Sequence, residues 1–144
     1  ADELTAISQY MVHSEMCDNW GYEKLHKAIE QQAHDEMHHA VWLIQRILFL
    51  DGMPVVSKLN PMKIGQSVLE MVTNDQADEV GAISAYNSAI GMAHEVADQS
   101  TADLLLKILK MEEGHVDWAE VQRAQIEQMG IENYLTNQTA GAAG

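Results

Sequence analysis

Two copies of a Glu-x-x-His motif are the part of this sequence best suited to chemistry. Glu36 precedes His39 by three positions, and Glu112 precedes His115 by the same spacing. Side chains three positions apart on an α-helix project from nearly the same face, so each pair could bind one side of a metal ion. Mixed carboxylate and imidazole ligands suit iron or manganese better than tetrahedral structural zinc. The motifs therefore predict metal binding on two helices.

A similar eight-residue segment precedes each motif at the same distance. Residues 3–10 read ELTAISQY and residues 79–86 read EVGAISAY, and each opens with a Glu 33 residues before the Glu of its motif (36 minus 3, and 112 minus 79). An internal repeat of two helix pairs would bring four Glu and two His together, which is the ligand set of a two-metal carboxylate site. The predicted metal ligands are Glu3, Glu36, His39, Glu79, Glu112 and His115.

The expected burial of these glutamates favours metal binding over mere surface acidity. Glu3 shares a helix stripe with Ile7 and Tyr10, so its carboxylate should lie in the core, and the second segment repeats the pattern. A buried carboxylate without a partner costs several kcal/mol, and two divalent cations would neutralise four of them. A single Glu-x-x-His pair usually lies on the protein surface. Two copies at the same distance from a preceding Glu predict a dinuclear site.

The composition limits the class of protein. At 144 residues, 47% of them apolar, the chain suits one globular domain. A formal charge of −14 with only eight Lys and Arg argues against nucleic-acid binding and favours cations as partners. No apolar run approaches the roughly 18 to 20 residues that span a bilayer, no signal peptide opens the chain, and Cys17 stands alone. We therefore expect a soluble, cytoplasmic protein without membrane or nucleic-acid partners.

Apolar positions recur with helical spacing everywhere except in one stretch, which holds both prolines, Pro54 and Pro61. Ser100, with Asp103 three positions on, has the pattern of a helix N-cap, and Gly130 should end the helix that follows. The predicted helices cover residues 1 to about 20, 22–50, 67 to about 97, 100–129 and, as a short piece, 131–136.

The lengths of the connections determine the expected topology. Short turns make the first and second helices, and the third and fourth, antiparallel neighbours. The stretch 52–66 could extend at most about 50 Å at roughly 3.3 Å per residue, enough to run the length of a bundle. We therefore predict an all-α, ferritin-like four-helix bundle with one long crossover and a short fifth helix. Residues 1–138 should form one domain, and residues 139–144 a flexible tail.

Over essentially its whole length the sequence resembles the bacterioferritins. The motifs that carry the resemblance are HDEMHHA at 34–40, RILFLDGMP at 46–54, MEEGHVDW at 111–118 and MGIENYL at 129–135. By position the six predicted ligands match that family's ferroxidase ligands, with Glu36 and Glu112 bridging, Glu3 and Glu79 terminal, and one His on each of two iron ions. The resemblance implies iron storage and detoxification, in which Fe(II) is oxidised by dioxygen or hydrogen peroxide and stored inside a hollow shell of 24 subunits.

The same resemblance implies a second cofactor at Met37. The matching methionine of the family binds haem iron at a two-fold interface, one from each subunit, and a ferredoxin-type reductant is a further expected partner. From the residues alone, a helical Met among nine would be read as packing. Met37 follows Glu36 by one residue and so points about 100° away from the metal site. The flanking His34 and His38 are expected to be exposed.

The sequence also departs from the bacterioferritin pattern. Gln31 and Asp35 stand where some relatives carry a His–Asp pair for iron on the inner surface, which puts that accessory site in doubt. Glu30 stands where relatives place an aromatic residue beside the haem. The chain begins two residues before Glu3, although relatives have a longer first helix, so we expect a processed start or an incomplete chain.

The role of Tyr10 and the reaction of the predicted metal site each have alternative interpretations. Tyr10, two helical turns from Glu3, is either the donor of a further electron or a core phenol hydrogen-bonded to a ligand carboxylate, and Trp118 is a weaker candidate donor. A rubrerythrin-like peroxidase, a manganese catalase or a small di-iron oxygenase would keep the same ligands, although the lack of a four-Cys module counts against rubrerythrin. A haem electron-transfer shell protein with an inert bundle site is the remaining alternative.

Overall fold

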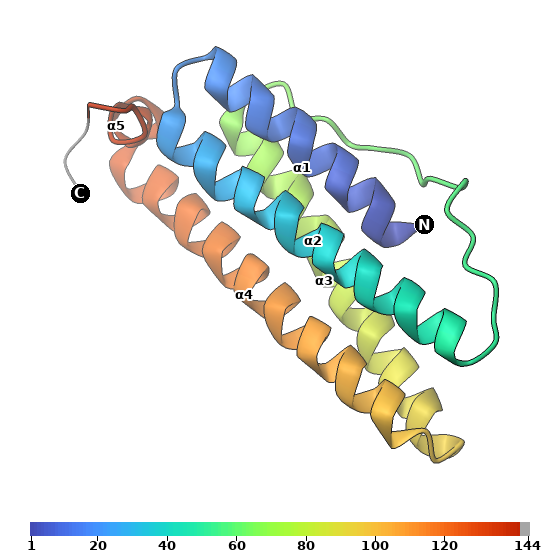
Figure 1. The fold of residues 1–144 in the computed structure, drawn as a ribbon. Helices are drawn as coiled ribbons and strands as arrows, with labels where there is room; N and C mark the ends of the chain where they lie inside the picture. Colours follow the sequence, from blue (N-terminus) through green and yellow to red (C-terminus); the bar gives the residue numbers. More distant parts are fainter. Residues whose placement is uncertain (142–144) are drawn as a thin grey trace.

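The computed structural model describes residues 1–141 and contains only α-helices, turns and one long connection (Figure 1). The predicted all-α four-helix bundle with a long crossover and a short C-terminal helix is confirmed, and no strand occurs within residues 1–141. The helices are α1 (Asp2–Asn19), α2 (Glu23–Phe49), α3 (Val68–Glu95), α4 (Gln99–Met129) and α5 (Ile131–Thr136).

The bundle consists of two antiparallel helix pairs. Helix α1 packs mainly along α2, and α3 along α4, because short turns join the members of each pair. Figure 1 shows the connection between α2 and α3 passing along the outside of the bundle, from one end to the other. This single crossover lets the second pair repeat the first, so that the repeated motifs face each other across the interior. None of the described helices is long and apolar enough to cross a membrane.

Most helix ends fall where the sequence predicts them, with one exception. Gly130, with φ 81°, ends α4 as expected. The prediction that Ser100 caps α4 is wrong, because the carboxylate of Asp98 accepts the Thr101 backbone N–H at 3.2 Å. Ala97 adopts a left-handed φ of 59° just before this cap, so the chain turns earlier and Ser100 lies inside the first helical turn.

A polar stripe on α1 holds the crossover against the bundle. Its members lie four positions apart, one helical turn, so they face the same direction. Each accepts a backbone N–H from the crossover: Thr5 Oγ1 from Asn60 at 2.8 Å, Gln9 Oε1 from Lys63 at 2.9 Å and His13 Nε2 from Gly65 at 3.0 Å. These bonds satisfy backbone donors that a connection without secondary structure would otherwise leave unpaired.

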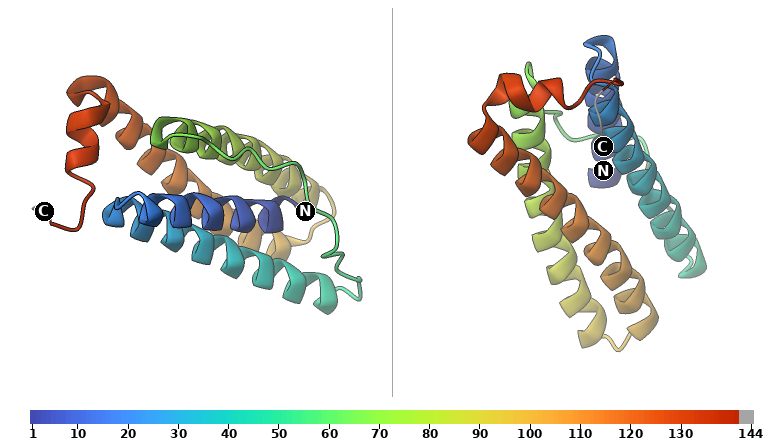
Figure 2. Two further views of the ribbon diagram at one scale, coloured as in Figure 1. Left: turned by 90° about the horizontal axis from the view of Figure 1, so that it is seen from above. Right: turned by 90° about the vertical axis from the view of Figure 1, so that its left-hand side faces the viewer.

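Apolar cores lie on either side of the bundle's midpoint, and α5 closes one end. Tyr134 of α5 is fully buried, and its hydroxyl donates to Gln122 Oε1 at 2.5 Å. The Lys24 backbone N–H also donates to the Gln138 carbonyl at 3.0 Å, which ties the chain after α5 to the start of α2. Figure 2 shows α5 lying across the end of the helices. Of the predicted tail 139–144, residues 142–144 lie outside the described residues, and its flexibility stays a prediction.

Candidate metal centre

The six predicted ligands converge from four helices at the middle of the bundle. Helices α1 and α3 each contribute one Glu, and α2 and α4 each contribute a Glu-x-x-His pair, whose i, i+3 spacing directs both side chains inward. All are buried, with exposed fractions of 9% for Glu3, 1% for Glu36, 0% for His39, 4% for Glu79, 1% for Glu112 and 7% for His115. Charged side chains are almost never buried to this degree without partners.

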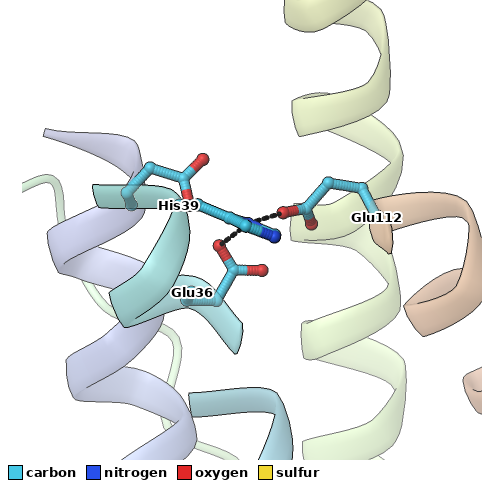
Figure 3. Close-up of side chains that lie close together, drawn as sticks. Glu36, His39 and Glu112 are labelled. Carbon is cyan, nitrogen blue, oxygen red and sulfur yellow. Dashed lines mark hydrogen bonds and ion pairs between the residues drawn. The ribbon is translucent and has the colours of Figure 1, made fainter. Parts of the chain in front are cut away.

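The first half of the cluster surrounds His39. Its Nδ1 lies 2.8 Å from Glu112 Oε1, 3.3 Å from Glu36 Oε2 and 3.5 Å from Glu3 Oε2. Figure 3 shows the carboxylates of Glu36 and Glu112 approaching the imidazole from opposite helix pairs. Ligand atoms of these four residues all lie within 4.8 Å of one another, a spacing from which small side-chain movements could bring them around one ion.

The second half surrounds His115 in the same way. Its Nδ1 lies 3.4 Å from Glu36 Oε1, 3.4 Å from Glu79 Oε1 and 3.8 Å from Glu112 Oε2. Glu36 and Glu112 belong to both four-residue groups, each offering one oxygen to either side, while each group has its own His. The His39 and His115 rings lie 6.5 Å apart between centroids. The two groups therefore share two carboxylates, an arrangement that could hold two adjacent ions.

The hydrogen bonding of the cluster supports bound cations. Among the described residues, every buried side-chain N or O atom that makes no hydrogen bond of good geometry belongs to one of the six predicted ligands, although some of these atoms lie at ion-pair distance from another ligand. The atoms are Glu3 Oε2, Glu36 Oε1, Glu79 Oε2, Glu112 Oε1 and His115 Nδ1. Leaving such groups unpaired in a folded interior costs about 1–3 kcal/mol each, and more for charged ones. A pair of divalent cations would satisfy these atoms together, so the residues fit a di-metal centre.

The metal-free cluster holds its protons tightly. Burial raises the pKa of Glu36 to about 8, and the nearby Glu3 carboxylate acts in the same direction. Burial by itself would lower the pKa of His39, but contacts with the surrounding glutamates, led by Glu112, outweigh it and raise that pKa to about 11. The pKa of His115 is likewise raised, against burial, by Glu36 and Asp35. Protons thus balance the negative charge that metal ions would otherwise neutralise.

Two tyrosines connect the repeats in a crosswise pattern. Tyr10 of the first segment donates its hydroxyl proton to Glu79 of the second, and Tyr86 of the second donates to Glu3 of the first. Burial raises the pKa of both phenols, so both remain neutral donors. The hydrogen bond to a ligand carboxylate that was predicted as one alternative for Tyr10 is present. Its acceptor is Glu79 and not Glu3, the glutamate of the same segment. Tyr86 was not predicted as a site residue. Its position in the repeat, which matches that of Tyr10, could have revealed it.

Behind the two histidines the repeat is broken. His115 Nε2 lies 3.0 Å from Asp35 Oδ2, whereas His39 Nε2 lies 3.2 Å from the thioether of Met111. Asp35 and Met111 occupy matching places, each one residue before the bridging Glu of its helix. Gln31 Nε2 donates to the other Asp35 oxygen at 3.1 Å, so the two residues at the position of the doubted accessory site lie behind His115. Sequence reasoning missed both contacts.

The indole of Trp42 lies beside the predicted ligand His39. Its ring lies 5.7 Å from the His39 ring between centroids, and Lys107 Nζ lies 4.0 Å above the indole. Trp118, the predicted weaker electron donor, is partly buried against the apolar core. Trp42 and Trp118 each follow the Glu of their motif by six residues, so the sequence repeat does not distinguish them, whereas in the structure they pack against different apolar clusters.

Met37 lies outside the metal cluster, as its position after Glu36 predicts. Its side chain is 51% exposed and lines a cavity of about 190 Å³, together with Ile7, Met11, Ser14, Glu15, Glu30, Ala33 and His34. A thioether beside the apolar side chains of this cavity fits haem ligation, whereas Glu15 and Glu30 add negative charge to the same cavity. His34 and His38 are exposed, as predicted.

The fold and the buried cluster of Glu and His are those of the ferritin-like class of four-helix bundles. The model of the ferritin-like domain family matches residues 1–129 of the chain. The chain is 42% identical over 137 residues to a bacterial ferritin of Synechocystis sp., a match that covers 94% of this chain and 88% of that protein. It is also 40% identical over 132 residues to a bacterioferritin of Mycobacterium leprae, covering 92% of this chain and 83% of that one.

A more distant relative gives the same result, since a bacterioferritin of Brucella melitensis is 35% identical over 132 residues, covering 92% of this chain and 82% of that protein. The chain therefore belongs to the bacterioferritin family.

Proposed function

We propose that this protein stores and detoxifies iron by oxidising Fe(II) at the cluster of four Glu and two His, with the Fe(III) product held as mineral inside a hollow shell of 24 subunits. Family membership supports iron storage, and the observation that carries the oxidation chemistry is the pair of four-residue groups that share Glu36 and Glu112. Two adjacent Fe(II) ions supply two electrons together, which reduces hydrogen peroxide to water or dioxygen to hydrogen peroxide.

The chain's own residues bind, orient and neutralise the substrate ions. Glu36 and Glu112 belong to both groups, so they would fix the distance between the two ions. Glu3 and Glu79 belong to one group each and would complete the ligands of one ion each. Iron binding at neutral pH must displace the proton that burial holds on Glu36 and the proton that the surrounding glutamates hold on His39. The displaced protons leave towards solvent, or towards the reduced oxidant.

Tyr10 is proposed as the donor of one further electron when the oxidant accepts more than two. Its hydroxyl is already hydrogen-bonded to Glu79, so the proton can pass to that carboxylate as the electron leaves the phenol. Burial keeps the phenol protonated until then. Trp118 lies against the core and is a weaker proposal.

Replacing a bridging or terminal ligand tests the function directly. Glu112→Ala or Glu79→Ala should abolish fast Fe(II) oxidation, because each change removes a ligand of the cluster. Stopped-flow absorbance after mixing with Fe(II) and dioxygen, or hydrogen peroxide, measures the rate. Glu113→Ala is the matched control, since Glu113 is exposed and adjacent to Glu112, and it should oxidise iron at the normal rate. Unchanged kinetics in Glu112→Ala would show that the cluster is not the site of Fe(II) oxidation. Release of oxygen from hydrogen peroxide would indicate a catalase instead.

The second proposed cofactor is a haem shared between two subunits through Met37. Support comes from the half-exposed thioether over the apolar residues of its cavity and from the bacterioferritin relatives. Met37→Leu should lose the bis-methionine absorbance spectrum after haem reconstitution, whereas Met53→Leu, on the exposed crossover, should keep it. An unchanged spectrum in Met37→Leu would remove this residue from the haem site.

Shell size, reductant and compartment are parts of the same proposal. A cytoplasmic shell of 24 subunits whose iron is released by a ferredoxin-type reductant agrees with the acidic composition and with the relatives. The mass of the intact assembly, measured together with its metal and haem content, tests the subunit number and both cofactors at once.

A further inference from the structure

We propose that Glu15, His26 and Glu30 form a second metal site, on the outer face of the α1–α2 pair, that binds one divalent transition-metal ion. His26 and Glu30 lie one turn apart on α2, and Glu15 reaches them from the end of α1. One ligand atom from each residue lies within 4.8 Å of the other two. This site is separate from the central cluster and does not depend on the proposed iron oxidation.

The orientation of His26 is the observation that favours a bound cation. Its Nδ1 lies 3.0 Å from the Ser14 backbone carbonyl and 2.9 Å from the Ser14 hydroxyl. That hydroxyl in turn donates to the His26 carbonyl at 3.1 Å, which leaves its oxygen free to accept. A carbonyl oxygen carries no proton, so Nδ1 must donate, and in neutral His26 the lone pair is on Nε2.

His26 Nε2 is directed at a carboxylate. It lies 3.3 Å from Glu30 Oε2, so in the neutral ring a lone pair faces an anionic oxygen. Two acceptors repel each other at this distance unless a positive centre lies near both. A ring that donates Nδ1–H to a backbone carbonyl and offers Nε2 outward is the usual arrangement of a metal-binding histidine.

The donor set determines the class of ion. One imidazole nitrogen and two carboxylates suit Zn²⁺, Fe²⁺ or Mn²⁺, and a divalent ion gives the group no net charge. Two ligand atoms about 2.0–2.2 Å from one ion lie roughly 3 Å apart, close to the observed 3.3 Å. The His26 side chain is 17% exposed and that of Glu30 48%, so solvent water can complete the coordination.

The location gives this site a consequence for the neighbouring cavity. Ser14, Glu15 and Glu30 line the cavity that contains Met37. A divalent ion would neutralise both carboxylates there, which otherwise add two negative charges beside an apolar surface. Occupancy of the site would therefore weaken the repulsion of any anionic group that enters the cavity.

Zinc binding at equilibrium tests the proposal. Isothermal titration of the assembled protein with Zn²⁺ should show that His26→Gln binds one ion per chain fewer than the unmodified protein. His38→Gln removes an exposed histidine of the same helix and should bind as many ions as the unmodified protein. Glu30→Gln leaves the His26–Ser14 contacts in place and should weaken the same ion by about tenfold or more.

The competing interpretation is a protonated His26 in an ion pair with Glu30. An unchanged zinc count in His26→Gln, together with an unchanged affinity in Glu30→Gln, would favour that pair and overturn the proposal. Fe(II) oxidation by the central cluster is measured in parallel and should stay normal in both variants. A central cluster that bound no metal would lower the count equally in all variants, so the loss of one ion in His26→Gln would still be visible.

Discussion

At the residue scale, the two proposed ion positions of the cluster differ although their proposed ligands match. The carboxylate of Asp35 lies 3.0 Å from His115 Nε2, and the thioether of Met111 lies 3.2 Å from His39 Nε2. A carboxylate is a strong acceptor that fixes the ring and makes its metal-binding nitrogen more basic, whereas a thioether is a weak acceptor. The His115 position should therefore hold its ion more tightly, and the two ions should bind in sequence.

Replacing Asp35 tests this difference. Asp35→Asn keeps the shape but removes the charge behind His115, so affinity at that position should fall by about 10–100-fold. Titration with Co²⁺, followed by absorbance, should then lose the tighter of two binding steps. Met111→Leu removes only a weak contact to His39 and should preserve both steps. Two equal steps in the unmodified protein would contradict the inequivalence.

The six residues of the cluster could be predicted because their spacing is periodic and repeated, and spacing can be read directly from the sequence. The contacts behind them could not. Tyr10 bonds to Glu79 and not to Glu3 of its own segment, because the antiparallel pairs place each tyrosine across from the other repeat. The group of Glu15, His26 and Glu30 spans a turn and follows no helical period as a whole, so only the packing of α1 on α2 reveals it.

At the element scale, the crossover is a structural part of the bundle and not a passive connection. Gly65 lies so close to the start of α3 that a Cβ atom there would clash with the Met71 backbone nitrogen. The Gly65 N–H also donates to His13 on α1. This point therefore fixes α1, the crossover and α3 relative to one another, and it positions the helices that carry Glu3 and Glu79.

A methyl group at this position should destabilise the fold. Gly65→Ala forces backbone against backbone, which costs about 1–3 kcal/mol in the free energy of unfolding. Gly91→Ala is the matched control, because a Cβ there meets nothing within 4 Å and the residue lies inside α3. Ala should stabilise that helix by about 0.5–1 kcal/mol. Urea unfolding measures both, and a loss of similar size in the two variants would refute the close approach.

The order of the elements could be predicted from hydrophobic period, Gly and Pro, and connector length. Two features could not. The start of α4 depends on a left-handed Ala97 that places Asp98 at the cap, and Ala carries no sequence signal for that conformation. The polar stripe of Thr5, Gln9 and His13 resembles a solvated helix face until the crossover is placed over it.

At the scale of the whole molecule, folding and metal binding are coupled through the protons of the cluster. Glu36 holds its proton to a pKa of about 8 in the folded chain against 4.5 in an unfolded one, so its contribution to stability declines as pH rises from 4.5 to 8. His39 holds its proton to about 11 against 6.5, so its contribution declines as pH rises from 6.5 to 11. Both contributions decline between pH 6.5 and 8.

The metal-free protein should therefore lose thermal stability as pH rises from 6.5 to 8. The lowered pKa of Glu3 acts only below pH 4.5 and does not offset this loss. Metal ions take the place of the protons and bind more strongly as the ligands deprotonate, so the difference in Tm between the metal-loaded and metal-free protein should widen over the same window. Scanning calorimetry at several pH values measures this difference. Glu36→Gln removes one of the titrating groups and should make the decline of the metal-free protein shallower. A difference in Tm that stays constant from pH 6.5 to 8 would show that these protons and the metal ions do not compete.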